Sequence, residues 1–202
     1  YNYSKAYAKC DVKTITETWT MMRIEKLIGE PINQNLFIEP YPFNNEIFEK
    51  YRDINIKEEN QIFSVCRLVN HKRLHHVIKA LSLIKNPPLL VIAGIGREYD
   101  KLKFMADSLK VPVKFVGEVT DEEKAKLIQQ SKFCIYLWAW LPIGEAAFFK
   151  KPSITYYGPD TSERLKNMPI YVETNNIKCL SNAIKDLSEN DNLRKEAGEN
   201  AY

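Results

Sequence analysis

Short apolar runs alternate with amphipathic segments from Gln61 to the end of the chain. Six such runs lie at 61–67, 89–94, 113–117, 133–137, 153–157 and 170–174, and each precedes a segment with the spacing of an amphipathic helix. Nearly continuous apolar strands that alternate with helices are typical of a parallel sheet covered on both faces. The pattern therefore predicts an α/β fold with a doubly wound, Rossmann-like parallel sheet.

The polar positions between these runs indicate where helices begin. Thr120 and Glu123 have the spacing of a capping box before the helix predicted over residues 121–130, and Pro142 suits the first turn of the next helix. In the first predicted helix the apolar side chains share one stripe, with Lys72 on the opposite side. Helices are predicted over residues 72–84, 97–109, 121–130, 142–151, 162–167 and 180–190.

The first sixty residues follow a different pattern. They predict a strand around Lys13 to Glu17, a helix from about Thr20 to Ile28, a strand over residues 35–40 and a loop over residues 41–48. Two prolines beside aromatic residues, at positions 40 and 42, are typical of an interdomain linker. We therefore divide the chain into residues 1–60, ending in a linker, and a domain over residues 61–202. The start at Tyr1 suggests a piece of a longer protein.

The composition excludes several classes of function. With 45% hydrophobic residues the chain can form a core, and a net charge of +3 indicates neither a nucleic-acid-coating surface nor an acidic tail. The four cysteines show no metal-like pairing, and the three histidines lack partners at ligand spacing, so no metal site is expected. We expect the three histidines, His71, His75 and His76, to be solvated on a helix face. Since the chain has neither a long apolar segment nor a signal-peptide pattern, we expect reduced thiols and a cytoplasmic location.

The candidate chemistry lies where predicted strands end. Arg67 closes the first strand, Lys72 opens the following helix, Gly94 follows the second strand, and Leu141 begins the helix after the fourth. Ligands of parallel sheets bind beyond the carboxyl ends of the strands, where cations and helix N-termini suit a diphosphate. Two alternatives stay open at this point: Arg67 and Lys72 are solvated surface charges, and Gly94 serves only a turn.

The order of the motifs resembles a known family. The segments CRLVNHKRLHHVIKAL, LLVIAGIGREYDKL, VKFVGEVTDEEKAKLIQQSKFCIYL and GEAAFFKKPSI, followed by the final LSNAIKDLSENDNLRKEAGENAY, occur in order. Together they resemble the C-terminal, donor-binding domain of GT-B glycosyltransferases, specifically the retaining family four, or glycosyl transferases group 1. The segment NLFIEPYPFNNEIF is similar to the linker of that family, and residues 1–30 look like the end of its N-terminal domain.

The resemblance implies roles for several residues. It makes Arg67 and Lys72 the catalytic cations that neutralise the departing diphosphate of a UDP- or GDP-linked sugar, together with the backbone amides near Leu141 and without a metal ion or other cofactor. Gly94 falls among the donor-binding residues. Glu145 matches the glutamate that accepts hydrogen bonds from the ribose hydroxyls.

Other positions match less completely. Val119 and Lys124 correspond to positions that flank the base of the donor. The signature of the family has a further glutamate eight positions before Glu145, where this chain has Leu137. That carboxylate meets the transferred sugar, so its absence affects sugar recognition and turnover. Trp138 and Trp140 replace small residues, and they either stack on a sugar or simply fill the pocket.

We therefore expect part of a glycosyltransferase that transfers sugar with retention from a nucleotide sugar to an acceptor glycan or lipid-linked glycan. The acceptor would bind mainly to an N-terminal domain, so residues 1–202 alone are expected to be inactive. Peripheral membrane association of the full-length protein, on the cytoplasmic face, stays open. Two alternatives also stay open: a degenerate nucleotide-binding module that has lost transfer, and a nucleotide-sugar epimerase.

Overall fold

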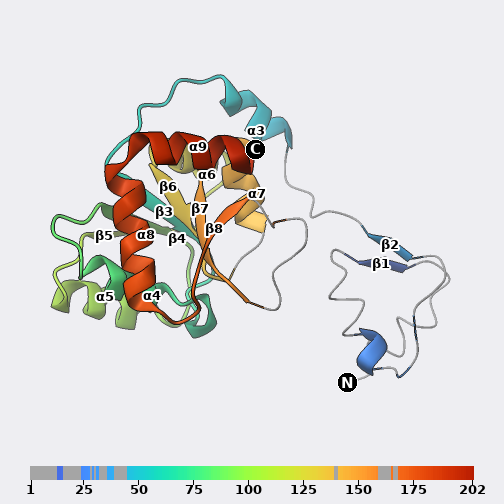
Figure 1. The fold of residues 1–202 in the computed structure, drawn as a ribbon, viewed down its shortest axis with the longest axis horizontal. Helices are drawn as coiled ribbons and strands as arrows, with labels where there is room; N and C mark the ends of the chain where they lie inside the picture. Colours follow the sequence, from blue (N-terminus) through green and yellow to red (C-terminus); the bar gives the residue numbers. More distant parts are fainter. Residues whose placement is uncertain are drawn as a thin grey trace.

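A single six-stranded parallel sheet organises the computed structural model, which describes residues 13–15, 24–27, 29, 31, 36–38, 45–138, 141–158, 165 and 168–202. The strand order is β5–β4–β3–β6–β7–β8 (Figure 1). The strands are β3 (Gln61–Val65), β4 (Leu89–Ala93), β5 (Val113–Gly117), β6 (Phe133–Ile135), β7 (Ser153–Tyr156) and β8 (Pro169–Val172). The prediction of a doubly wound parallel sheet is confirmed.

Alternate strand residues contribute to two apolar clusters on opposite faces of the sheet. In β3, Ile62 belongs to one cluster and Phe63 to the other, as the two-residue period of a strand requires. Helices α4 (Leu74–Leu81), α5 (Tyr99–Ser108) and α8 (Ile177–Glu189) supply the first cluster. Helices α3 (Asn45–Arg52), α6 (Asp121–Gln130) and α7 (Leu141–Phe148) supply the second. Both faces of the sheet are therefore covered.

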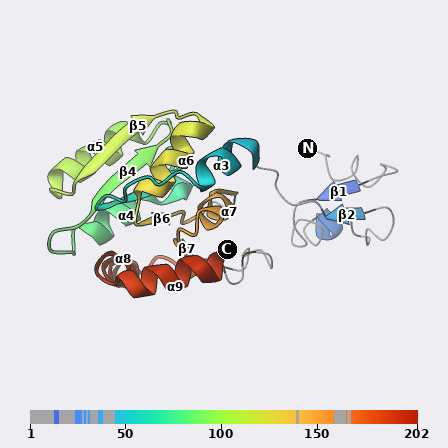
Figure 2. The same ribbon diagram turned by 90° about the horizontal axis from the view of Figure 1, so that it is seen from above.

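The predicted loop over residues 41–48 is wrong from Asn45 onward, because α3 begins there. Phe48 and Tyr51 lie on one side of this helix, where both are buried and Phe48 belongs to the second cluster. Glu46 in the first turn and Arg52 in the last turn carry charges that complement the helix dipole. Figure 2 shows α3 lying beside α6, in agreement with the contacts between the two helices. Burial against α6 thus stabilises a helix in a segment for which the preceding prolines predicted a linker.

The first helix after β3 begins later than predicted. Lys72 ends a short 3-10 turn, η1 (Asn70–Lys72), and α4 starts only at Leu74. Between them Arg73 adopts the left-handed conformation with φ of 57°, which interrupts regular helix geometry. Lys72 is therefore not on the outer side of α4 as predicted, and its side chain turns toward β6.

Among the remaining helices, α6 agrees with its prediction, whereas the helix that follows α8 was not predicted. Helix α6 covers the predicted residues, and Thr120 and Glu123 form the expected capping box. Helix α8 is followed by α9 (Asp191–Ala201), and Asn190 caps the start of the second helix. The helix predicted over 162–167 lies outside the described residues except for Leu165.

Near the start of the chain, β1 (Lys13–Ile15) and β2 (Leu36–Ile38) form a separate parallel pair, as the predicted strands there suggested. Residues 24–27 are helical, within the helix predicted over 20–28. Cys66, Cys134 and Cys179 carry free thiols, and Cys10 lies outside the described residues. Within the described part of the chain, no helix combines the length and the apolar character that a membrane span needs.

Candidate functional site

The candidate site lies at the carboxyl ends of β3 and β6, where the order of the sheet reverses. Strand β3 pairs with β4 on one side and with β6 on the other. The connections after these two strands therefore diverge, which opens a crevice where parallel sheets bind ligands. Arg67 and Lys72 follow β3, whereas Leu137 and Trp138 follow β6.

Gly94 brings the end of β4 against the exit of β3. Its φ is 121°, and a Cβ at this position would lie 2.0 Å from the main-chain oxygen of Cys66. The backbone is fixed on both sides, since the Cys66 amide donates to Ala93 O at 3.1 Å and the Gly94 amide to Gly117 O at 2.6 Å. Only glycine suits this combination of φ and close approach. Gly94 thus sets the path of the chain that leads to Arg67.

Lys72 is half-buried and reaches across the switch point. Its ammonium donates a hydrogen bond to the main-chain oxygen of Trp138. Burial lowers the pKa of Lys72, and the nearby Arg67 lowers it further, while Cys66 acts in the opposite direction. The ammonium is therefore partly stripped of water and held between β3 and β6.

Arg67 belongs to a local group of cations around His71. The pKa of His71 is lowered by burial and by the positive charges of Lys72 and Arg67, with Arg73 and Arg97 adding to the effect. Arg67 is exposed, and its side chain forms no ion pair with any residue in the described part of the chain. The site is accordingly electropositive although the net charge of the chain is small.

Sequence reasoning missed Arg97 as a member of this group. It is exposed and lies in the loop after β4, next to Gly96. Its position directly after a Gly-x-Gly turn at a strand end was the signal that could have identified it.

A second polar pair joins α6 to α7. Lys124 Nζ lies 2.6 Å from Glu145 Oε1 and 2.9 Å from Asp121 Oδ1. Glu145 is only 3% exposed, so burial raises the pKa of its carboxyl group while Lys124 lowers it. Burial also lowers the pKa of Lys124, but the bonds to Glu145 and Asp121 outweigh this, and the net shift is upward. We infer that both groups stay charged at neutral pH, because each buried charge is stabilised by the opposite charge of its partner.

The apolar candidates divide between core and surface. Val119, after β5, is partly buried against the second apolar cluster, while Leu141 starts α7 and is 36% exposed. Leu137 is 3% exposed and belongs to the first apolar cluster. It shares the wall of a void of about 10 Å³ with Lys72 and Trp138. Leu137 is thus a core residue in this structure.

The two tryptophan candidates have different outcomes. Trp138 is partly buried, packs against the first apolar cluster and lies so close to Gly158 that a Cβ there would be 3.2 Å from its ring. This arrangement agrees with the packing alternative rather than with an indole that faces a ligand. Trp140 lies outside the described residues.

The expectation that all three histidines are solvated on a helix face is wrong for His76. Its Nδ1 lies 2.7 Å from the Tyr156 hydroxyl, and its ring packs edge-on to His75 at 4.4 Å. Burial, followed by the proximity of His75 and Arg73, lowers the pKa of His76 to about 4. His76 is thus a neutral packing residue between α4 and β7. Among the described residues, no group of three or more His, Cys, Asp or Glu side chains is placed to hold a metal ion.

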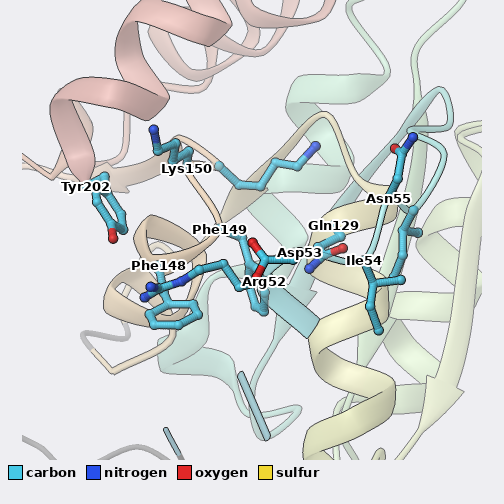
Figure 3. Close-up of a pocket in the computed structure, with 11 residues that line it drawn as sticks. Arg52, Asp53, Ile54, Asn55, Gln129, Phe148, Phe149, Lys150 and Tyr202 are labelled. Atoms are coloured by element: carbon cyan, nitrogen blue, oxygen red, sulfur yellow. The ribbon is translucent and has the colours of Figure 1, made fainter. Parts of the chain in front are cut away.

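A cavity of about 370 Å³ lies at the opposite, amino-terminal edge of the strands (Figure 3). Its cations already have partners. Arg52 pairs with Glu49 at 3.0 Å and covers the Phe148 ring at 4.3 Å, and Lys150 pairs with Glu199 at 2.8 Å. None of the predicted donor-binding residues lines this cavity. We therefore place the candidate site at the switch point, despite the larger volume here.

Comparisons with known proteins point to a single family. The family model for glycosyl transferases group 1 matches residues 46–202. No curated protein sequence matches the chain. The catalytic domain of cholesterol-alpha-glucosyltransferase from Helicobacter pylori is 25% identical, with a TM-score of 0.63 over 70% of this chain and 94% of that one.

Two longer structures share the fold. A TarM mutant from S. aureus, in complex with Fondaparinux, alpha-GlcNAc-glycerol and UDP, has a TM-score of 0.77 at 22% identity, covering 98% of this chain and 41% of that chain. HepE of Anabaena in complex with UDP and glucose has a TM-score of 0.75 at 14% identity, covering 97% of this chain and 58% of that chain. The present chain therefore spans about half the length of these two proteins.

Proposed function

Because the chain belongs to the glycosyl transferases group 1 family, we propose that it binds the nucleotide-sugar donor of a glycosyltransferase. The observation that carries the proposal is the position of Arg67 and Lys72 at the switch point of the sheet, with Glu145 in the middle of α7. The solved structures support the donor class, since the TarM and HepE complexes contain UDP.

The two cations are suited to the diphosphate. Arg67 forms no ion pair within the described part of the chain, and Lys72 uses one of its three N–H groups on a carbonyl oxygen. Charge-assisted hydrogen bonds to phosphate oxygens are stronger than neutral ones, and they strengthen further as charge develops on the leaving group. Together with the amides at the start of α7 near Leu141, they are proposed to stabilise bond breaking without a metal ion.

Glu145 is proposed to receive the ribose hydroxyls. Lys124 holds Oε1, and no hydrogen bond to Oε2 forms within the described residues, which leaves this oxygen for hydroxyl donors. The Lys124 side chain and the backbone at Val119 would border the base. The buried ion pair keeps the carboxylate charged, and therefore an acceptor, in a site that excludes most water.

Retention of configuration, the sugar and the acceptor belong to the proposal as well. We propose that an acceptor glycan or lipid-linked glycan binds to a preceding domain, so that residues 1–202 bind the donor without transferring sugar. A cytoplasmic location and peripheral membrane association of the whole protein complete this view.

A binding module that has lost transfer is the second candidate, because Leu137 occupies the position of a family carboxylate and is buried. In either case affinity should come mainly from the nucleoside diphosphate. The best nucleotide sugar should then bind within about tenfold of its free diphosphate, since tenfold corresponds to about 1.4 kcal/mol.

Thermal shift with UDP, GDP and ADP side by side, with and without EDTA, tests the binding proposal. We expect one nucleotide to raise the unfolding temperature, with EDTA making no difference. Absence of any shift at millimolar nucleotide would contradict the proposal. Incubating the full-length protein with a panel of nucleotide sugars then separates the candidates: a transferase releases a glycosylated acceptor, whereas a binding module shows the shift alone.

A further inference from the structure

Trp138 connects the exits of three neighbouring strands. It follows β6, its main-chain oxygen accepts a hydrogen bond from Lys72 after β3, and its ring packs on Gly158 after β7. The indole is partly buried against the first apolar cluster. No other residue in the described part of the chain accepts a hydrogen bond from the Lys72 ammonium.

This connection matters because a lysine side chain is flexible. A free lysine loses much rotamer freedom when it binds an anion, and a side chain that is already held loses less. The Trp138 oxygen holds the Lys72 ammonium in a half-buried position and leaves two N–H groups for a ligand.

The indole ring of Trp138 is itself held by a close contact. Trp138 follows β6, and its ring lies directly against Gly158, where a Cβ would come within 3.2 Å of the ring. A Cβ at position 158 would require the tip of the indole ring to shift by a few tenths of an ångström, and a larger side chain would require a larger shift of the ring. Because glycine has no side chain, position 158 leaves the space that the indole occupies.

We propose that Trp138 is a positioning residue for Lys72: its indole, seated on Gly158, fixes the carbonyl oxygen that orients the ammonium toward the donor diphosphate. The inference rests on the proposed function and adds a role that acts through Lys72 and not through contact with the sugar. It also explains why a bulky residue is accommodated at the end of β6 beside a predicted anion site.

A double-mutant cycle, with UDP titrated by calorimetry, tests this role. Trp138→Ala should weaken UDP binding by about 3- to 10-fold, the effect of releasing one rotamer-rich side chain, whereas Trp138→Phe should lose less. In a Lys72→Met background the Trp138→Ala change should cause no further loss, because the group that it positions is gone.

Gly158→Val provides an independent perturbation that leaves Trp138 in place. It should displace the ring and cause the same loss of UDP affinity, which again depends on Lys72. Urea unfolding verifies that each variant is folded. Equal losses from Trp138→Ala with and without Lys72, or no loss with Lys72 present, would overturn the inference. If wild-type protein binds none of UDP, GDP and ADP, the proposed function itself fails. Binding that depends on Lys72 but is additive with Trp138 overturns only the positioning role.

Discussion

Replacing Leu137 by glutamate would place a carboxylate in the core next to Lys72. Leu137 is 3% exposed and borders a void of about 10 Å³, too small to solvate a charge. Loss of the leucine costs about 1.5–3 kcal/mol of burial. At a pH above its raised pKa, a buried carboxyl group costs about 1.36 kcal/mol for each unit by which burial raises that pKa, so a rise of two units adds about 3 kcal/mol at pH 7. We expect Leu137→Glu to lower the free energy of unfolding by about 4–6 kcal/mol at pH 7.

Urea unfolding at several pH values measures this loss. Because the raised pKa makes the folded state bind the proton more tightly, the penalty is complete above the folded pKa and disappears below the unfolded pKa of about 4.3. The difference in free energy of unfolding between Leu137→Glu and wild type should therefore narrow as the pH falls from 7 to about 4. Leu137→Gln, which is similar in shape but uncharged, should show a loss without this pH dependence.

Lys72 could pair with the new carboxylate, so Leu137→Glu is also made in a Lys72→Met background. A salt bridge would make the loss smaller in the presence of Lys72. A Leu137→Glu protein within about 1 kcal/mol of its parent in both backgrounds would refute the reasoning. It would mean that residue 137 faces an open pocket and not the core.

Two further changes test the backbone and the packing around the site. Gly94→Ala should lower the free energy of unfolding by at least about 3 kcal/mol in urea titrations, because φ is 121° and the new Cβ would clash with Cys66 O. The control variant Gly144→Ala, which has open space around the new Cβ, should be neutral or stabilising. Because the pKa of His76 is lowered to about 4, wild-type stability should fall as the pH drops from 6.5 toward 4, and His76→Gln should reduce that fall; equal pH profiles would show that His76 does not titrate in this way.

The strands and α6 could be predicted because their signals are local. A buried parallel strand needs a short apolar run, and the capping box at Thr120 fixes the start of its helix whatever packs around it. The fold class followed from the repetition of these units, and the sheet reversal between β3 and β6 lies where strand-end residues pointed to a ligand site.

The features that sequence reasoning missed depend on tertiary contacts. Helix α3 forms because Phe48 finds a buried place near α6, and the prolines before it gave the opposite signal. The bond from Lys72 to Trp138 O spans 66 positions, and the Lys124–Glu145 pair spans 21. No local pattern encodes either contact. The last predicted helix ended at residue 190, so helix α9 was likewise not predicted, although asparagine favours the capping position that Asn190 occupies.

The calorimetric affinity of the chain for its preferred nucleoside diphosphate, measured for wild type, Arg67→Ala and Lys72→Ala, tests the central claim most directly. Each change removes one charge-assisted interaction of about 1.5–3 kcal/mol, so each variant should bind roughly 10- to 100-fold more weakly. Lys79→Ala, which removes an exposed cation at the other end of α4, should bind like wild type. Unchanged affinity in both the Arg67 and Lys72 variants would contradict the assignment of the diphosphate site to the switch point of the sheet.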